Sequence, residues 1–226
     1  MQFQLHDADG RQAITLEIRE LVIAGMTGRN AQAVQTHIDE LKEIGVEPPS
    51  SIPIYYRASA TLLTTSNRVQ VVGPDSSGEV EAVLIGTPEG MLVAVGSDHT
   101  DRKMESDSIA FSKQACPKPI SRHLWRYSEV AEGWDDIELI SDRVVDGQRM
   151  PYQRGTLAAV REPEDLIGGF FEGLRELPAG VAMFTGTLPT VGEITGADHF
   201  AMALVDPGRG RTLWHGYDTV ILPHVS

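Results

Sequence analysis

The chain alternates short apolar runs with polar, glycine-containing turns along most of its length. Val, Ile and aromatic residues are frequent in these runs, and Gly, Pro, Asp or Asn bound them, as is typical of β-strands. We predict strands over 3–7, 12–18, 20–25, 52–57, 68–73, 79–86, 91–97, 137–145, 180–186, 200–206 and 212–222. Because helices do not alternate with these strands, the pattern favours a mainly antiparallel fold of the all-β or α+β class.

Two segments have the apolar period of an amphipathic helix. The first runs over 31–44, after the favourable N-cap residue Asn30 and before Gly45. The second runs over 162–174, with Pro163 and acidic residues in its first turn. Their apolar faces consist of Ala31, Val34, Ile38 and Leu41 in the first helix and Leu166, Phe170 and Leu174 in the second. We expect these to be the two main helices.

Length and composition narrow the class of protein. A chain of 226 residues that is 41% hydrophobic can bury one substantial core, so we expect a single domain over 1–226. Its net charge of −13, from 19 basic and 32 acidic residues, argues against nucleic acid as a partner. The polar start lacks the pattern of a signal peptide, and no apolar run reaches the ~20 residues of a membrane helix, which argues against a membrane partner. With Cys116 as its single cysteine, the chain forms no internal disulfide, and we expect a cytoplasmic protein.

Three acidic residues accompany the apolar strands predicted at 79–86 and 91–97. Glu79 and Glu81 are two positions apart, so their side chains point to the same face of the strand, and Asp98 follows the next strand. One interpretation is a strand with a solvated face. The other is a metal site, because hard divalent cations such as Mg²⁺ prefer oxygen ligands.

Three further residues carry candidate chemistry. His37 and Glu40 lie three positions apart on the first helix, so they form either a solvated helix edge or a His–Glu pair that activates water. Lys113, beside a predicted strand end, is either a solvated surface residue or a fixed positive charge for a carboxylate or an oxyanion.

A second group of candidates follows the strand at 180–186. Thr185, Gly186 and Thr187 form either an ordinary turn or a loop whose hydroxyls and amides receive an anionic group. Cys116 has no motif around it, and we interpret it as a small buried residue.

The motifs occur in a characteristic order along the chain. They are HIDE (37–40), IYYR (54–57), EVEAVLIG (79–86), SDHTDR (97–102), KQACPKP (113–119), TGTLPTVG (185–192) and HGYDTV (215–220). This order resembles the fumarylacetoacetate hydrolase superfamily over about residues 20–222, and the segment 144–170 resembles its hairpin and following helix. The resemblance implies a fold of mixed and antiparallel strands around a β-roll. It also implies a homodimer, with a hairpin-like segment over 1–20 and a catalytic region over 21–226.

The resemblance also implies roles for individual residues. A divalent ion is expected to be bound by Glu79, Glu81 and Asp98. The expected ion is Mg²⁺, and the alternatives are Mn²⁺, or Ca²⁺ in crystals. Arg102 steadies Asp98 from outside the ligand set. The residues that contact the substrate or activate water are His37, Glu40, Arg57, Lys113, Thr185 and Thr187. Of these, His37 and Glu40 activate the attacking water, Lys113 stabilises the oxyanion, and the others bind the substrate carboxylate.

The implied reaction is metal-dependent hydrolysis of a C–C bond in a small acylpyruvate-like or β-diketo acid, so the partner is a small anionic substrate. Two alternatives remain open. In the first alternative, the same site belongs to a lyase that acts on 2-oxo acids as a decarboxylase, hydratase or tautomerase. In the second alternative, the protein is a metal-binding or ligand-binding module without catalysis.

Overall fold

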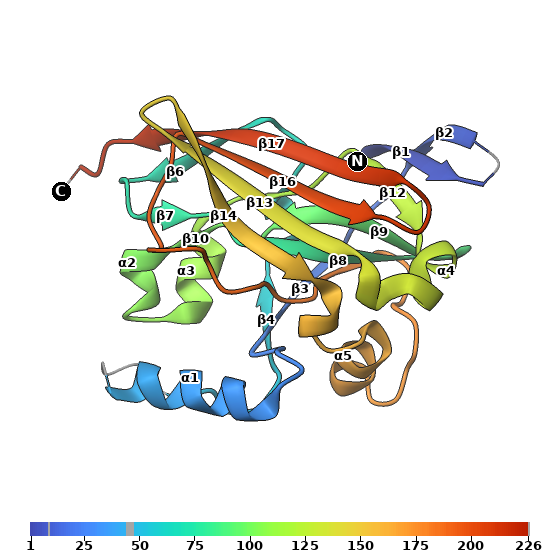
Figure 1. The fold of residues 1–226 in the computed structure, drawn as a ribbon, viewed down its shortest axis with the longest axis horizontal. Helices are drawn as coiled ribbons and strands as arrows, with labels where there is room; N and C mark the ends of the chain where they lie inside the picture. The colour runs from blue at the N-terminus through green and yellow to red at the C-terminus, as the bar shows by residue number, and fades with distance from the viewer. Residues whose placement is uncertain (9, 44–47, 226) are drawn as a thin grey trace.

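The computed structural model describes residues 1–8, 10–43 and 48–225, and the side chains of His37, Glu40 and Leu41 lie outside that description. Among the described residues, one sheet has eight strands in the order β2-β1-β12-β9-β8-β15-β3-β4 (Figure 1). Its strands are β1 (Gln2–Asp7), β2 (Gly10–Thr15), β3 (Glu20–Gly25), β4 (Ile54–Ala58), β8 (Val80–Thr87), β9 (Gly90–Ser97), β12 (His123–Arg126) and β15 (Val181–Phe184). Within it, β1 pairs with β12 and β15 pairs with β3 in parallel, and the other pairs are antiparallel.

A five-stranded sheet packs against the first, in the order β14-β13-β16-β17-β6. Its strands are β6 (Arg68–Val72), β13 (Glu138–Val145), β14 (Gln148–Thr156), β16 (His199–Asp206) and β17 (Arg211–Leu222). Two short pairs complete the described strands, namely β5 (Leu63–Thr64) with β11 (Lys118–Pro119) and β7 (Ser76–Ser77) with β10 (Thr100–Asp101). The predicted fold of mixed and mainly antiparallel strands is confirmed.

Helices occupy the periphery of the two sheets (Figure 1). They are α1 (Ala31–Glu43), α2 (Arg102–Glu105), α3 (Ile109–Ala115), α4 (Tyr127–Val130) and α5 (Pro163–Phe170), with 3₁₀ turns η1 (Ala60–Leu62), η2 (Ala131–Asp136) and η3 (Leu157–Ala159). In the part of the chain that the structure describes, no helix combines the length and the apolar character needed to cross a bilayer.

Two apolar cores cover the two faces of the eight-stranded sheet. The larger lies between the sheets and unites Val80, Ala82 and Leu84 of β8 with residues of the other sheet, such as Phe200 and Tyr217. The other face of the eight-stranded sheet has a core of its own, made of Phe3, Leu5, Leu21, Ile23, Leu63, Val83, Ile85, Leu92, Ala94, Ile120, Leu124, Ala182 and Phe184. Both faces of β8 are therefore buried, which accounts for its nearly continuous apolar sequence.

The first predicted helix is confirmed as α1. Asn30 Oδ1 accepts hydrogen bonds from the backbone N–H groups of Gln32 and Ala33, both at 3.1 Å, so it caps the helix as predicted. Val34 and Ile38 are buried. Gly45, the predicted terminus, lies outside the described residues.

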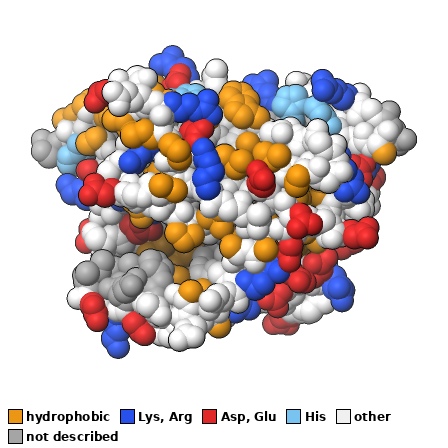
Figure 2. All heavy atoms as spheres, in the orientation of Figure 1, with side chains coloured by type: hydrophobic (Ala, Val, Ile, Leu, Met, Phe, Trp, Pro, Cys, Tyr) orange, Lys and Arg blue, Asp and Glu red, His pale blue; other side chains and the backbone are white. Residues whose placement is uncertain are grey.

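The second helix, α5, is shorter than predicted. It ends at Phe170 because Glu172 and Gly173 have positive φ values of 41° and 86°, and Gly173 N–H donates to Gly168 O at 3.0 Å, as in a C-terminal helix cap. Leu174, predicted on the apolar face, lies beyond the helix and is exposed. Figure 2 shows acidic side chains gathered at the lower right, where α5 lies in Figure 1.

The hairpin β13–β14 confirms the expectation for 144–156. Asp146 and Gly147 form its turn with φ values of 51° and 74°, as a two-residue type I′ turn requires. Periodicity alone missed β14 because Pro151 interrupts it. Pro151 is accommodated because β14 is an edge strand and the register shifts opposite it, between Ser141 and Asp142.

Candidate metal centre

The three predicted acidic ligands converge at one end of the β8–β9 hairpin. Glu79 lies just before β8, Glu81 lies within it, and Asp98 follows β9. One carboxylate oxygen from each residue lies within 4.8 Å of the others. Glu81 and Asp98 are 2% and 0% exposed, so the interpretation of a solvated strand face is wrong, and the structure brings the three acids together.

The strand residue paired with Glu81 lies against an apolar core. Gly96 of β9 is the direct partner of Glu81 in the ladder, and a Cβ atom there would approach side-chain atoms of Val83, Ile120 and Phe184 to within 2.6–2.9 Å. These three residues belong to the second core, on the face of the eight-stranded sheet that points away from the five-stranded sheet. The carboxyl group of Glu81 therefore borders an apolar core, which is why it is desolvated.

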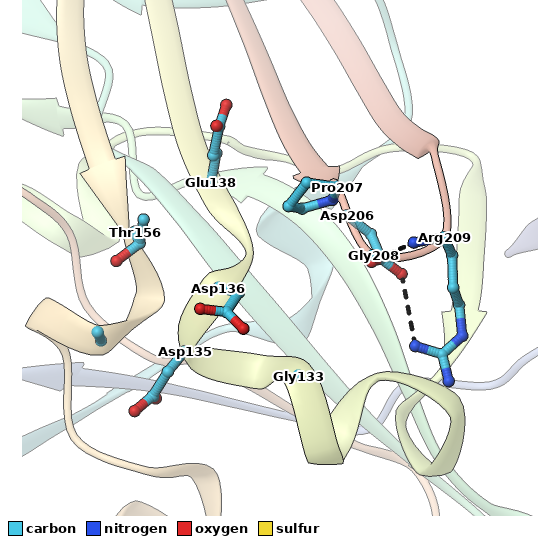
Figure 3. A pocket seen from close by; sticks show the side chains of 10 residues that line it. Gly133, Asp135, Asp136, Glu138, Thr156, Asp206, Pro207, Gly208 and Arg209 are labelled. Carbon is cyan, nitrogen blue, oxygen red and sulfur yellow. Dashed lines mark hydrogen bonds and ion pairs between the residues drawn. The ribbon is translucent and has the colours of Figure 1, made fainter.

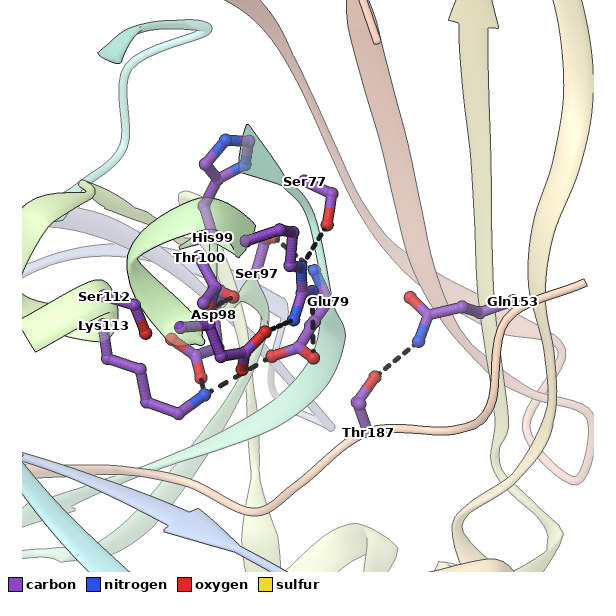
Figure 4. Close-up of polar contacts among 12 residues, drawn as sticks. Ser77, Glu79, Ser97, Asp98, His99, Thr100, Ser112, Lys113, Gln153 and Thr187 are labelled. Carbon is purple, nitrogen blue, oxygen red and sulfur yellow. Dashed lines mark hydrogen bonds and ion pairs between the residues drawn. The ribbon is translucent and has the colours of Figure 1, made fainter. Parts of the chain in front are cut away.

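Asp98 is compensated by two buried lysines. Lys113 Nζ donates a hydrogen bond to Asp98 Oδ2 (Figure 4). Lys118 Nζ lies 3.0 Å from Asp98 Oδ1. Burial by itself would raise the pKa of Asp98, but the two ammonium groups outweigh it and lower that pKa to about 2. Asp98 is therefore ionised at neutral pH.

Glu79 is paired with Arg102 and more loosely with Lys113. Arg102 Nη2 lies 3.0 Å from Glu79 Oε1, and Lys113 Nζ lies 3.5 Å from Glu79 Oε2. Arg102 also donates to Ser77 Oγ at 2.6 Å and to Glu105 Oε2 at 2.8 Å. The guanidinium group thus lies against Glu79 rather than against Asp98, the residue that we expected it to steady.

Glu81 is the acid whose charge is least compensated. It has no ion pair with any described residue, although Gly186 N–H donates to its Oε2 at 2.7 Å. Burial and the neighbouring Asp98 and Glu79 together raise the pKa of Glu81 well above its ordinary value. A positive charge shared by the three carboxylates would remove this penalty.

The donor set fits a hard divalent cation. Asp98 Oδ1 is buried and, among the described residues, accepts no hydrogen bond despite its ion pair with Lys118, so it retains a lone pair for a cation. Glu79, Glu81 and Asp98 supply carboxylate oxygens only, which is the ligand type that Mg²⁺ and Mn²⁺ prefer.

The loop after β15 is tied to β8 by its polar groups. Thr185 Oγ1 donates to Ala82 O at 3.0 Å, and Thr187 Oγ1 donates to Val80 O at 2.7 Å. Between them, the amide of Gly186 binds the Glu81 carboxylate. The amide of this loop thus binds a carboxylate of the protein itself, whereas both hydroxyls donate to backbone carbonyls of β8. The substrate-binding roles of the two threonines remain predictions.

Lys113 lies in a helix and not beside a strand end. It belongs to α3, whose first turn is capped by Ser108 Oγ, which accepts from Phe111 N–H at 3.4 Å. Lys113 is 7% exposed, so the interpretation of a solvated surface lysine is also wrong. Burial opposes its charge, but Asp98 and Glu79 outweigh burial and raise the pKa of Lys113. It is a permanent cation at the edge of the acid cluster.

Arg57, another predicted substrate-binding residue, is not brought to the acids. Arg57 of β4 pairs with Glu20 at 3.1 Å and lies over the ring of Phe170, whereas its neighbour Tyr56 faces Lys113. Since adjacent strand residues point to opposite faces, Arg57 points away from the acid cluster. His37 and Glu40 lie on α1, and their side chains lie outside the described residues.

Three buried polar residues at the site were missed by the sequence analysis. Lys118 contacts Asp98 and also donates to His99 O at 2.5 Å. His99 is wholly buried, and Gln153 donates to Thr187 Oγ1 at 2.7 Å (Figure 4). No local signal marks Lys118, because a lysine between two prolines is usually solvated. His99 could have been noted as a polar residue directly after a continuous apolar strand.

A surface pocket of about 440 Å³ lies elsewhere, against the five-stranded sheet (Figure 3). Asp135, Asp136, Glu138, Asp206 and Arg209 are among its lining residues. Asp206 accepts from Arg209 N–H at 3.0 Å, and Asp135 is paired with an arginine outside the pocket. Among the residues whose side chains the structure describes, no predicted site residue lines this pocket, so the candidate chemistry stays at the acid cluster.

Solved structures identify the fold. A fumarylacetoacetate hydrolase family protein from Yersinia pestis CO92 matches with a TM-score of 0.66 and 18% identity, over 96% of this chain and 100% of that chain. A 5-carboxymethyl-2-hydroxymuconate delta-isomerase from Mycobacterium smegmatis matches with a TM-score of 0.59 and 14% identity, over 100% and 99% of the two chains. A 2-keto-3-deoxyarabinonate dehydratase matches with a TM-score of 0.64 and 14% identity, over 95% and 78%. The protein therefore has the fumarylacetoacetate hydrolase fold, and the resemblance found in its sequence is confirmed at the level of the fold.

The sequence also identifies a family within that fold. Residues 24–217 match the family described as protein of unknown function (DUF2848), and the chain belongs to this family. No curated protein matches the sequence.

Proposed function

We propose that the protein is a divalent-metal-dependent hydrolase that cleaves a C–C bond in a small acylpyruvate-like or β-diketo acid. The observation that carries the proposal is the convergence of Glu79, Glu81 and Asp98 within 4.8 Å, with the buried ammonium group of Lys113 beside them. The fumarylacetoacetate hydrolase fold supports it, since the related structures include enzymes named for acting on 2-oxo or hydroxymuconate acids.

The three carboxylates would hold Mg²⁺ or Mn²⁺, and such an ion supplies Lewis-acid polarisation of carbonyl and carboxylate oxygens. Lys113 and Lys118 lie beside Asp98, and Arg102 is shared between Glu79 and Glu105, so no basic residue that the structure describes neutralises Glu81 directly. A divalent ion would add two positive charges to this site, which favours a small anionic substrate.

The reaction consumes one water per substrate. The water oxygen forms a bond to the distal carbonyl carbon, and the C–C bond between that carbon and the adjacent methylene breaks. The electron pair of the broken bond stays with the 2-oxo acid fragment, which takes up a proton, and the other product is a carboxylic acid. In this scheme Lys113 stabilises the oxyanion that forms at the attacked carbonyl.

Proton removal from the water is assigned to the pair on α1. His37 and Glu40 are three residues apart on that helix, a spacing at which side chains of a helix meet. His37 takes the proton and Glu40 orients the imidazole. Thr185, Thr187 and Arg57 are the proposed contacts for the substrate carboxylate, although Arg57 would have to reach it from the other face of β4.

The experiment is metal analysis of the purified protein followed by turnover of an acylpyruvate with and without chelator. We expect one divalent ion per chain, chelator-sensitive activity, and loss of both in Glu81→Gln. Glu89→Gln is the matched control, because Glu89 is an exposed acid at the turn of the same hairpin. Full activity of the chelated wild-type protein, or of Glu81→Gln, would overturn the proposal.

A lyase that acts on 2-oxo acids is the second candidate. The related structures named as an isomerase and a dehydratase favour it, because neither reaction hydrolyses a C–C bond. Oxaloacetate tested beside the acylpyruvate separates the two, and His37→Ala should abolish hydrolysis while sparing decarboxylation. Bound metal with no turnover of either compound would instead indicate a binding module.

A further inference from the structure

Two of the three acids lie just beyond the paired residues of the β8–β9 ladder. The last pair of the β8–β9 ladder is Val80 with Ser97, so Glu81 is inside the ladder while Glu79 and Asp98 lie one residue beyond it. A single backbone hydrogen bond, from Asp98 N–H to Glu79 O at 2.9 Å, joins these two residues. Their side-chain directions therefore depend on support from outside the hairpin.

That support is a buried chain of hydrogen bonds that starts at Tyr217 of β17. Tyr217 Oη is 2.9 Å from Ser97 Oγ and 2.9 Å from His99 Nδ1. Ser97 Oγ accepts the backbone N–H of Glu79 at 3.1 Å. The other ring nitrogen of His99, Nε2, is 2.9 Å from Ser76 Oγ. The phenol thus contacts the two residues that flank Asp98, and it connects to the backbone of Glu79 through Ser97.

The rings are also fixed by packing. Tyr217 stacks on Phe200, with ring centroids 5.6 Å apart and an interplanar angle of 29°. His99 meets both rings edge to face at 5.6 Å. A Cβ atom on Gly78, the residue before Glu79, would lie 2.7 Å from Tyr217 Oη, so the backbone passes directly over the phenol. Neither ring can move without displacing the segment that carries an acid.

His99 also links this chain to the lysine that compensates Asp98. Its carbonyl oxygen accepts from Lys118 Nζ at 2.5 Å, and the same ammonium group lies 3.0 Å from Asp98 Oδ1. The orientation of the His99 peptide therefore sets where Lys118 meets Asp98. Figure 4 shows the ring of His99 above Asp98 and Glu79, and the ammonium group of Lys113 below them.

We infer that His99 and Tyr217 are positioning residues, which hold Glu79 and Asp98 in the geometry that binds a divalent cation. Neither side chain bonds to a carboxylate of the cluster. Both act through the backbone of the two residues that the ladder leaves free, and they connect the acid cluster to the five-stranded sheet. The inference rests on the proposed function of this cluster as a metal site.

Mn²⁺ titration of the metal-free full-length protein, followed by the paramagnetic resonance of free Mn²⁺, tests the inference. Tyr217→Phe keeps the stacked ring and removes only the hydroxyl, and His99→Gln keeps a polar group of similar reach. We expect each to weaken Mn²⁺ binding about 10–100-fold, as is usual when a group behind the ligands is removed. The double variant should lose less Mn²⁺ affinity than the product of the two single-variant fold-changes, because both residues act through one network.

Tyr127→Phe is the matched control. The hydroxyl of this buried tyrosine donates to Glu164 Oε1 at 2.9 Å, in the region of α4 and α5. The control variant loses a hydrogen bond of the same length, so its thermal stability should fall comparably while its Mn²⁺ affinity stays within about twofold. Equal Mn²⁺ affinity in Tyr217→Phe and wild type, or equal weakening in Tyr127→Phe, would overturn the inference.

Crystal structures of the metal-free wild type and Tyr217→Phe separate this inference from the proposed function. We expect the contacts Arg102–Glu79 and Lys118–Asp98, both 3.0 Å in the wild type, to change by more than ~0.5 Å in the variant. If wild type binds no Mn²⁺, the proposed function fails, while a shift of these contacts still supports positioning. Unchanged contacts would refute positioning whatever the outcome of the titration.

Discussion

Gly186 provides the sharpest test of how the acid cluster is built. Its amide donates to Glu81 Oε2 at 2.7 Å, and its φ of 105° lies in the region that only glycine adopts easily. A Cβ atom at this position would lie 1.8 Å from Thr27 Oγ1 and 3.0 Å from Thr27 Cβ. Gly186→Ala should therefore force the loop away from Thr27 and withdraw its amide from Glu81.

The expected loss of folding stability in Gly186→Ala has two contributions. A left-handed backbone costs an L-residue about 1–2 kcal/mol. Loss of the Gly186–Glu81 hydrogen bond costs about 1–3 kcal/mol, depending on whether the carboxyl group is charged. We expect Gly186→Ala to lower the free energy of unfolding by about 2–5 kcal/mol, before any cost of moving Thr27.

Urea denaturation of the variant and a matched control measures this difference. Gly192 in the same loop also has a positive φ, 83°, but a Cβ atom there would meet no atom within 4 Å. Gly192→Ala should therefore cost only the backbone strain of about 1–2 kcal/mol. Thr27→Ala combined with Gly186→Ala should recover part of the loss. If the two glycine variants unfold at the same urea concentration, the proposed crowding against Thr27 is refuted.

Four further predictions concern other parts of the structure. Metal-free Glu81→Gln should be at least as stable as wild type at pH 7, because the substitution removes a buried carboxyl group that lies beside two others. Mn²⁺ should raise the melting temperature of the wild type but not that of Glu81→Gln. A rise in both proteins would place the ion elsewhere. Asn30→Ala should destabilise the protein by about 1 kcal/mol in urea, through loss of the α1 cap, and an unchanged midpoint would contradict this. Burial, Lys118 and Arg102 lower the pKa of His99 to about 3 from 6.5, so the unfolded chain binds more protons between these pH values and stability falls as the pH drops through them. His99→Gln should lose less stability than wild type between pH 7 and pH 4, and parallel losses would exclude this residue as the source. Burial raises the pKa of Cys116 to about 11, so its thiol should react with a disulfide reagent at pH 8 only after denaturation, and rapid reaction of the native protein would contradict its burial.

The elements of the fold that follow from local physics were predictable from sequence. Strand patterning located β8, β9 and β13, and the cap at Asn30 located the start of α1. The end of α5 was not predictable from its apolar period, because the left-handed backbone at Glu172 stops the helix while the pattern continues to Leu174. Short strands such as β7 and β10 have no period of their own, since two residues are too few to show one.

The acid cluster was predictable in part, and for a specific reason. The spacing of Glu79 and Glu81 fixed their common face, and Asp98 joined them as an acid after the neighbouring strand, but the sequence left a solvated face and a metal site both open. Lys118 and Tyr217 could not be placed from spacing, because their roles depend on contacts across long separations in the chain. Arg57, which the resemblance placed at the substrate, pairs with Glu20 on the other face of β4, and its spacing in the sequence did not indicate this.

The charged groups of the cluster all come from one uninterrupted stretch of chain. The acids span the β8–β9 hairpin, and Arg102, Lys113 and Lys118 follow directly after it. The arrangement therefore depends little on how the rest of the polypeptide is connected. A circular permutant with its new termini at the exposed turn between β13 and β14 would leave residues 79–118 intact. The same set of charged groups would therefore be kept when the two sheets are connected in a different order.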